Sequence, residues 1–379
     1  MGSARSPGLG TRASRRRIYG PATARASQPS ATLAVRGVPY VPPMTAQPAT
    51  AGASASVFDR VADEYDRVRP TYPDELVDRA CELAGTGPGD EVLEIGCGTG
   101  QLTRSLLARG LRVVAVEPGN RLRSLAERNL RGAGEVDFVH APLEEARLPH
   151  RHFRAVFSAS AFHWIDPRLS WQKAADVLLP GGTLALIQYF GLAHRHSDAD
   201  QQQLLAAVGR VAPDVASGWP SYRDLDDTLA GVRRRRGNIS EVWEWLGGQE
   251  LAQARAGELF GDVRVAAVPA LLDHSAEELN AVVRTMSFHA RLSPAQRGSL
   301  EEETTRLYER LGRPIRSSTV AVLVTAQRRA DDEDSDEALH AWAPSAGSIA
   351  LRFAARRSGV AAQVAAVRVN RRPPARAPR

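Results

Sequence analysis

The stretch that most constrains the fold runs over residues 91–103, EVLEIGCGTGQLT. Its first five residues are mostly apolar and predict a short strand, and the leucine spacing from Gln101 onward predicts a helix. Between them, Gly96, Gly98 and Gly100 predict a turn whose backbone comes close to a ligand, because side chains there would prevent the approach. Such a strand–turn–helix unit presents backbone N–H groups and the positive end of a helix dipole to that ligand.

The spacing of these glycines separates two classes of ligand. A dinucleotide-binding turn needs G-x-G-x-x-G, and its third glycine would fall on Gln101. A nicotinamide-dependent oxidoreductase is therefore disfavoured. The glycines instead follow Glu94 in the pattern E-x-G-x-G-x-G, which resembles the first motif of the class I S-adenosylmethionine-dependent methyltransferases. The resemblance implies S-adenosyl-L-methionine as cofactor, with Glu94 near its methionine end and the turn, including Cys97, against it.

A second carboxylate follows at the expected distance. Residues 111–116 are an apolar strand that ends on Glu117, followed by Pro118. A carboxylate one strand–helix unit past the glycines can accept hydrogen bonds from both hydroxyls of a ribose. The other interpretation of Glu117 is a solvated loop acid, and its position after the glycine turn favours the binding role.

Two further landmarks of the same family lie downstream. The loop after a third strand over 136–139 is where the family contacts the adenine ring, which implies roles for Leu143 and Glu144. A fourth strand over 153–158 would bring Ser158 and Ala159 to the cofactor. The pattern L-x-P-G-G-x-L over 178–184 opens the fifth strand. Arg154 departs from the family, which usually has Asp there.

The opening of the folded region resembles one subgroup more closely. Residues 58–73 follow F-x-x-x-A-x-x-Y-x-x-x-R-P-x-Y-P, similar to the methyltransferase type 11 or trans-aconitate methyltransferase-like proteins. In that subgroup this segment closes over cofactor and substrate, which implies Tyr65 and Arg69 as substrate-binding residues. Packing of Tyr65 in the core is the equally weighted alternative.

The string A-F-H-W-I-D-P over 161–167 matches the subgroup's loop after the fourth strand. Such a loop should flank the transferred methyl group, which makes His163 a candidate catalytic base and Trp164 a candidate substrate contact. The alternative roles, which we favour, are a histidine that holds the loop and a packing tryptophan. Asp166 is expected to cap the next helix.

These elements predict an α/β fold: a Rossmann-like, seven-stranded, mostly parallel sheet with helices on both faces and an antiparallel last strand. Residues 190–260 read as a helical lid inserted after the fifth strand, with arginines at 233–236 that could meet an anionic substrate or form a solvated face. The closing strands are expected over 262–268 and 319–325.

Composition sets the limits of the domain, which we place at residues 57–329. Residues 1–56 are Ala-, Arg-, Ser- and Pro-rich with seven arginines and no acid, and residues 330–379 pass from an acidic run into an Arg/Pro-rich tail with eight arginines. Both are expected to be disordered. Met44 is an alternative start, and a transit peptide is a minor option for the leader.

The net charge of +6 belongs to these tails, so the middle is slightly acidic and no nucleic-acid partner is expected. No stretch is long enough to span a membrane, and two cysteines exclude a disulfide scaffold or a cysteine-rich metal site. We expect a cytoplasmic protein without a metal.

The sequence thus predicts methyl transfer from S-adenosylmethionine to a small-molecule acceptor, at a carboxylate or hydroxyl oxygen. A hydroxyl needs a base such as His163, whereas a carboxylate is already ionised. A non-catalytic S-adenosylmethionine-binding or interaction protein is the main alternative.

Overall fold

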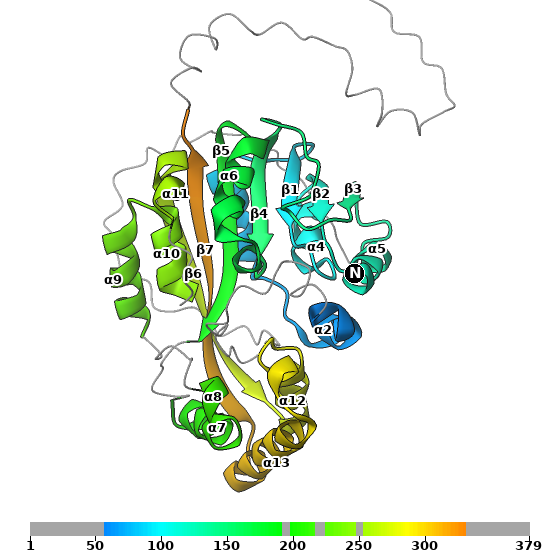
Figure 1. Ribbon diagram of the computed structural model, residues 1–379, viewed down its shortest axis with the longest axis vertical. Helices are drawn as coiled ribbons and strands as arrows, with labels where there is room; N and C mark the ends of the chain where they lie inside the picture. The colour runs from blue at the N-terminus through cyan, green and yellow to red at the C-terminus, as the bar shows by residue number, and fades with distance from the viewer. Residues whose placement is uncertain (1–56, 192–197, 217–223, 248–252, 331–379) are drawn as a thin grey trace, which may run out of the picture. The chain divides into compact units, whose positions relative to one another are not determined.

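The computed structural model describes residues 57–191, 198–216, 224–247 and 253–330 (Figure 1). Contacts divide the chain into a unit that ends at Arg328 and a second unit, Arg329–Arg379, which lies outside the described residues except for positions 329 and 330. The predictions of a disordered leader and tail therefore concern residues that the structure does not describe, and they stay predictions.

One mixed sheet organises the first unit. Its strands are β1 (Glu91–Ile95), β2 (Arg112–Val116), β3 (Val136–Val139), β4 (Phe153–Ala159), β5 (Leu178–Gly191), β6 (Phe260–His274) and β7 (Ile315–Arg328). They lie in the order β3-β2-β1-β4-β5-β7-β6. Strands β1 to β5 pair in parallel, and β7 runs antiparallel to both β5 and β6. The predicted seven-stranded sheet with an antiparallel last strand is confirmed.

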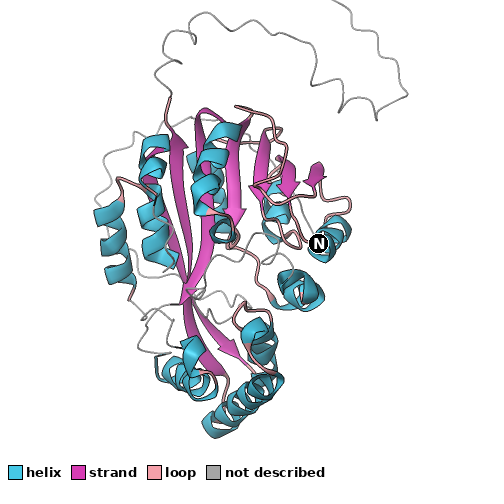
Figure 2. Ribbon diagram, in the orientation of Figure 1, coloured by secondary structure: helices cyan, strands magenta, loops and turns pink. Residues whose placement is uncertain are grey.

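Helices cover both faces of this sheet (Figure 2). Those between the glycine turn and β5 are α4 (Gln101–Leu107), α5 (Asn120–Asn129) and α6 (Pro167–Val177), and α2 (Ala62–Val68) and α3 (Asp74–Ala84) precede β1. As predicted, α6 is capped by Asp166, whose carboxylate accepts the Arg168 N–H.

The core of the sheet follows the alternation of its side chains. On β7, Val320, Val322 and Val324 belong to a cluster on one face, while Ala321 and Leu323 belong to a cluster on the other. All five are at most 1% exposed. A strand buried on both faces requires a continuous apolar sequence, and the run that begins at Val320 provides it.

The inserted segment between β5 and β6 contributes to two different packing groups. Its helices are α7 (Asp198–Val211), α8 (Pro213–Ala216), α9 (Leu225–Arg235), α10 (Ile239–Gly247) and α11 (Ala254–Leu259). Helices α10 and α11 join the core on one sheet face, where Trp243 is completely buried. Helices α7 and α8 instead pack with α12 (Ala276–Arg284) and α13 (Pro294–Leu311) around a separate apolar cluster (Figure 1).

The two closing strands are longer than predicted. The expected ranges were 262–268 and 319–325, but β6 and β7 continue past the main sheet to the α7–α8–α12–α13 group (Figure 1). Pro269 follows directly on the predicted end of the first range, yet it lies within β6. Because β6 is the edge strand of the sheet, a proline is tolerated there.

Within the described residues, no helix is both long enough and apolar enough to cross a membrane.

Candidate functional site

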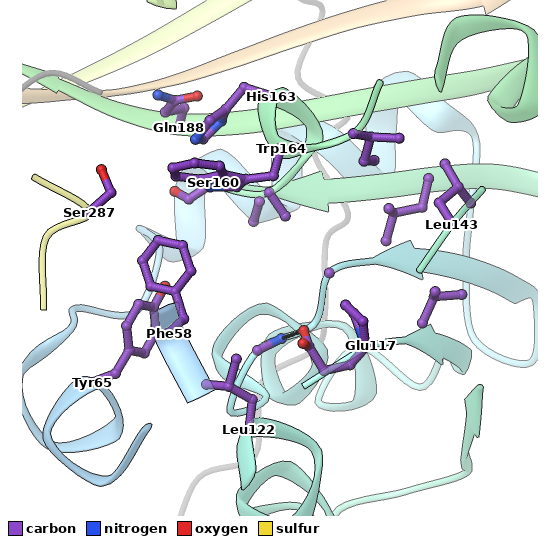
Figure 3. A pocket seen from close by; sticks show the side chains of 18 of the residues that line it. Phe58, Tyr65, Glu117, Leu122, Leu143, Ser160, His163, Trp164, Gln188 and Ser287 are labelled. Atoms are coloured by element: carbon purple, nitrogen blue, oxygen red, sulfur yellow. Dashed lines mark hydrogen bonds between the residues drawn. The ribbon is translucent and has the colours of Figure 1, made fainter. Parts of the chain in front are cut away.

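A large cavity opens at the carboxyl ends of the parallel strands (Figure 3). Its empty volume is about 1270 Å³, which includes space open to solvent. Ile95, Glu117 and Ala159 line it at the ends of β1, β2 and β4, and Gln188 lines it from β5. This edge is where open α/β sheets bind ligands.

The glycine turn forms one wall because its backbone adopts conformations that suit glycine. Gly96 has φ of +71°, and a Cβ atom added to it would lie only 2.3 Å from the Cβ of Ala161. The turn therefore lies directly against the loop after β4. Gly96 and Gly98 both line the cavity, whereas Gly100 serves as the N-cap of α4 with φ of +93° and is not among the lining residues.

Glu117 holds this wall to the end of β2. One carboxylate oxygen accepts the Gly98 N–H at 2.9 Å, and the other accepts the Gly119 N–H at 2.8 Å. The side chain is 4% exposed; burial raises its pKa, and the two backbone N–H groups oppose that shift. Each oxygen retains a lone pair for a further donor. Glu117 is therefore not a solvated loop acid, because its carboxylate is buried and lines the cavity.

Glu94 lies deeper than predicted. It is 1% exposed on β1, and it is not among the residues that line the cavity. Burial raises its pKa from 4.5 to about 7; the Thr103 hydroxyl opposes the shift, and the Glu117 carboxylate adds to it. Its Oε2 has no hydrogen-bond partner within the described part of the chain. A direct contact of Glu94 with a cofactor stays a prediction.

Two other predicted cofactor residues also lie behind the cavity wall. The Cys97 side chain is 4% exposed, and burial raises its pKa well above 9.0. Ser158 is fully buried on β4 and donates its hydroxyl to the Ile95 carbonyl at 2.9 Å. Neither lines the cavity. Ser158 thus ties β4 to β1, and Ala159, one residue later, lines the cavity because successive side chains of a strand point to opposite faces.

The loop after β3 supplies the next part of the wall. Leu143 and Glu144 of this loop line the cavity, and so does Pro118, which follows β2. Glu144 Oε1 accepts the Asp166 N–H at 3.2 Å, while its buried Oε2 has no partner among the described residues. A buried oxygen without a donor fits a ligand amino group, because an unpaired polar atom is otherwise costly.

Helix α2 and the turn before it cover the opposite side. Phe58, Tyr65 and Trp164 form an aromatic group in which Phe58 meets the Trp164 ring edge-on at 5.3 Å (Figure 3). Arg69 stacks over the Tyr65 ring at 5.1 Å. All four line the cavity, so Tyr65 is exposed to it in addition to packing among aromatic side chains.

Arg69 is held in place from a distant part of the chain. Its Nε donates to the Thr285 hydroxyl at 3.0 Å, and its Nη2 donates to the Thr285 carbonyl at 2.9 Å. It forms no ion pair with a carboxylate among the described residues. Among the described residues that line the cavity, it is also the only arginine or lysine.

His163 and Gln188 lie side by side across the cavity from Glu117 (Figure 3). Burial lowers the pKa of His163 to about 4, and the Gln188 amide opposes this without forming a hydrogen bond of normal geometry. The imidazole is therefore neutral at neutral pH. A base with this pKa is weak, because efficient general bases have a pKa near the working pH.

Several lining residues have no counterpart in the sequence prediction. They include Leu122, Ser160, Gln188, Tyr189 and residues 286–288. Gln188 could have been found as the one amide in an apolar strand. Residues 286–288 follow α12 and carry no motif, so only the fold reveals them.

No described residue from α7 to α11 lines the cavity. The described part of residues 190–260 therefore makes no contact with the cavity, and the lid stays a prediction. Arg233, Arg234 and Arg236 are exposed, and Arg235 stacks on Trp245 at 4.2 Å, which favours the solvated-face interpretation of the arginine run.

Comparison with known proteins shows which family the chain belongs to. A methyltransferase-domain family model matches residues 93–186. An uncharacterized methyltransferase of Mycobacterium bovis is 34% identical over 149 residues, 38% of this chain and 75% of the relative. The chain belongs to the methyltransferases.

Other relatives of this methyltransferase share shorter stretches. An uncharacterized methyltransferase of Mycobacterium tuberculosis is 36% identical over 130 residues, 34% of this chain and 51% of the relative. The chain thus spans about half the length of the first curated relatives that it matches. Among solved structures, a Haemonchus contortus phosphoethanolamine N-methyltransferase complex is 13% identical, with a TM-score of 0.39 over 72% of this chain and 58% of that one.

The family is S-adenosylmethionine-dependent, and S-adenosyl-L-methionine is the cofactor. The residues of the cavity fit this group. The Glu117 oxygens have capacity for hydroxyl donors, and the unpartnered Glu144 Oε2 can accept from an amino group.

Proposed function

We propose that this methyltransferase transfers a methyl group from S-adenosylmethionine to an oxygen of a small molecule, and that a carboxylate oxygen is the favoured acceptor. The observation that carries the choice is Arg69, a cation in the cavity lining that no described carboxylate neutralises. An anionic acceptor would supply the missing charge, and charge-assisted hydrogen bonds to arginine are among the strongest in proteins.

The cofactor half of the cavity follows from its polar atoms. Glu117 would hold the ribose hydroxyls, Leu143 and Pro118 would pack against the adenine, and Glu144 would accept from its amino group. Gly96 and Gly98 allow the backbone to approach the methionine part. When bound, the cofactor supplies an electrophilic methyl group on a sulfonium sulfur. The aromatic side chains around the acceptor exclude water and align the reactants.

His163 supports the same choice of acceptor. Its lowered pKa leaves a neutral, weakly basic imidazole, which suits an acceptor that is already ionised. A hydroxyl acceptor with His163 as base is the second candidate, since His163 lines the cavity. The opening motif at 58–73 supports placement in the trans-aconitate methyltransferase-like subgroup.

We also propose that the protein works in the cytoplasm on small molecules, without a nucleic-acid or membrane partner. Both cysteines are free and buried, which suits a reducing compartment. The slightly acidic middle of the chain argues against binding to nucleic acid.

A methyl-transfer assay on the full chain tests the proposal. With phenylacetate and trans-aconitate as carboxylate probes and the corresponding alcohols as hydroxyl probes, we expect methyl esters only. Replacing Arg69 by Met removes the cation, and kcat/KM for the acid should fall by roughly 10- to 100-fold, because hydrogen bonds to charged groups contribute about 1.5–3 kcal/mol. Arg69→Lys should retain part of the activity.

Controls separate this effect from misfolding. Arg67→Met removes a nearby arginine in the last turn of α2, whose side chain is 63% exposed, and should leave kcat/KM unchanged. The Kd for S-adenosylhomocysteine should stay the same in both variants. Methyl transfer to alcohols alone, or no loss in Arg69→Met, would reject the carboxylate assignment.

A further inference from the structure

Gln188 is a buried amide that interacts with His163 but forms no hydrogen bond of normal geometry through its Oε1. It lies on β5 between Ile187, which is completely buried, and Tyr189, which lines the cavity beside it. Its side chain is 3% exposed, it lines the cavity, and its Oε1 has no hydrogen-bond partner among the described residues. A buried amide oxygen without a donor is costly, so a donor from a ligand would remove that cost.

A second unpartnered atom lies beside it. The His163 Nδ1 is buried without a hydrogen-bond partner in the part of the chain that the structure describes. Figure 3 shows the imidazole next to the Gln188 amide, on the side of the cavity away from Glu117. The two side chains reach this point from different elements, η1 (Phe162–Trp164) and β5. Together they offer an amide acceptor and an imidazole nitrogen to one ligand group.

The surroundings decide which group fits. Trp164, Met286 and Phe288 line the same cavity, and the His163 ring is neutral because burial lowers its pKa to about 4. A carboxylate here would lie against the amide oxygen, and neither Gln188 nor the neutral His163 carries a positive charge to balance it. An ammonium group would lose its hydration and gain no counter-ion. A hydroxyl meets neither cost, because it donates to one atom and accepts from the other.

We propose that Gln188 and His163 form a subsite for a neutral hydroxyl group on the acceptor, distinct from the oxygen that receives the methyl group. The hydroxyl donates to Gln188 Oε1 and accepts from the Nδ1–H tautomer of His163. Gln188 is then a specificity-determining residue. Resting on the proposed function, this narrows the acceptor to a hydroxy acid with an apolar or aromatic body, its carboxylate toward Arg69 and its hydroxyl toward Gln188.

Binding to the full chain saturated with S-adenosylhomocysteine tests the subsite without requiring turnover. The probes are 3- and 4-hydroxyphenylacetate, phenylacetate, and the two methoxy analogues, which keep the ring but lose the O–H donor. We expect at least one hydroxy acid to bind about tenfold more tightly than phenylacetate and its methoxy analogue, since a site built for a hydroxyl discriminates against ligands that lack it. Isothermal titration calorimetry gives each Kd.

Gln188→Met keeps the length of the side chain and removes its hydrogen-bonding atoms. It should bring the hydroxy-to-deoxy affinity ratio close to one, through weaker binding of the hydroxy acid alone. Gln172→Met is the matched control, because Gln172 Oε1 is also unpartnered but the residue lies on α6 and does not line the cavity. It should leave the ratio unchanged, and the Kd for S-adenosylhomocysteine should be the same in both variants.

The outcomes separate the two proposals. Equal binding of hydroxy and deoxy acids by the wild-type protein, no binding of any hydroxy acid, or an unchanged ratio in Gln188→Met overturns the subsite. Methyl transfer to the acids without a hydroxyl preference keeps the proposed function and rejects the subsite. A hydroxyl preference in binding, with no methyl transfer to any acid, keeps the subsite and rejects the proposed function.

Discussion

Glu94 occupies a position on β1 where its two protonation states differ strongly in free energy. Burial raises its pKa from 4.5 to about 7 in the folded protein, so the folded state binds more protons than the unfolded state between these values. The contribution of a raised group is fully present below pH 4.5 and is lost as pH rises through 7. The buried carboxylate therefore weakens the ligand-free fold at alkaline pH.

Glu94→Gln should remove this dependence. Between pH 4 and pH 8, the free energy of unfolding of the wild type should fall relative to that of the variant by on the order of 3 kcal/mol. Urea denaturation of both ligand-free proteins across this range measures the difference. Parallel pH profiles for the two proteins would show that Glu94 is not buried as an ionisable group.

Sequence reasoning at this scale found residues that occur in short patterns. Gly96, Gly98, Glu117, Leu143 and Glu144 were all predicted from local motifs, and all line the cavity. How deeply each side chain is buried could not be predicted in the same way. Glu94, Cys97 and Ser158 belong to the same strands and turn, but the alternation of side chains and the packing of neighbouring strands place them behind the wall, and that depends on the whole sheet.

At the scale of elements, α2 is held over the cavity by contacts on two sides. The Asp59 carboxylate, just before α2, accepts the N–H groups of Arg121 and Leu122 at 2.6 and 3.0 Å, in the first turn of α5. On the other side, Glu64 pairs with Arg284 at 2.8 Å. These contacts fix the segment that carries Phe58 and Tyr65 into the lining.

Asp59→Ala should release one side of this segment. The lost cap costs about 1 kcal/mol of stability, and we expect the Kd for S-adenosylhomocysteine to rise several-fold, as measured by calorimetry. Asp63→Ala removes an exposed ion pair of α2 with Arg121 and should change neither quantity, because such pairs contribute little. Equal effects of the two substitutions would contradict a specific role for the Asp59 contacts.

Elements with a strong local signal were predicted with accurate boundaries. The strands over 91–95 and 136–139 have the predicted bounds. The extensions of β6 and β7 were missed, since their outer parts contain the exposed Pro269 and the buried polar residues Ser317 and Ser318. The Ser318 carbonyl accepts a hydrogen bond from Gln201 of α7, which is 117 residues away. No local sequence pattern predicts packing against a segment so far away in the chain.

At the scale of the whole molecule, the apolar clusters of the sheet and the cluster of the α7–α8–α12–α13 group are separate. Regions with fewer shared contacts open at lower free energy than the core. Hydrogen–deuterium exchange should therefore be slowest in β1, β4 and β5 and faster in α7, α8 and α12. Bound S-adenosylhomocysteine should slow exchange in the glycine turn and α2, but not in α13. Uniform exchange across both groups would indicate a single cooperative unit.

The fold class was predictable for the whole molecule because four landmarks occur in order along the chain. The contact of Arg69 with Thr285 at the edge of the cavity was not, because these two residues are 216 residues apart. Their contact depends on the path of β6 and β7.

The order of the strands also bears on how the protein is made. Strand β5 pairs with β7, which follows it by more than 120 residues. During synthesis on the ribosome, the edge that carries Leu184, Leu186 and Ile187 stays unpaired until the last strand emerges. An exposed apolar edge promotes aggregation. A chain terminated before Ile315 should therefore be cleared or aggregate rather than persist as a partly active enzyme, which places premature stops in this gene among complete losses of function.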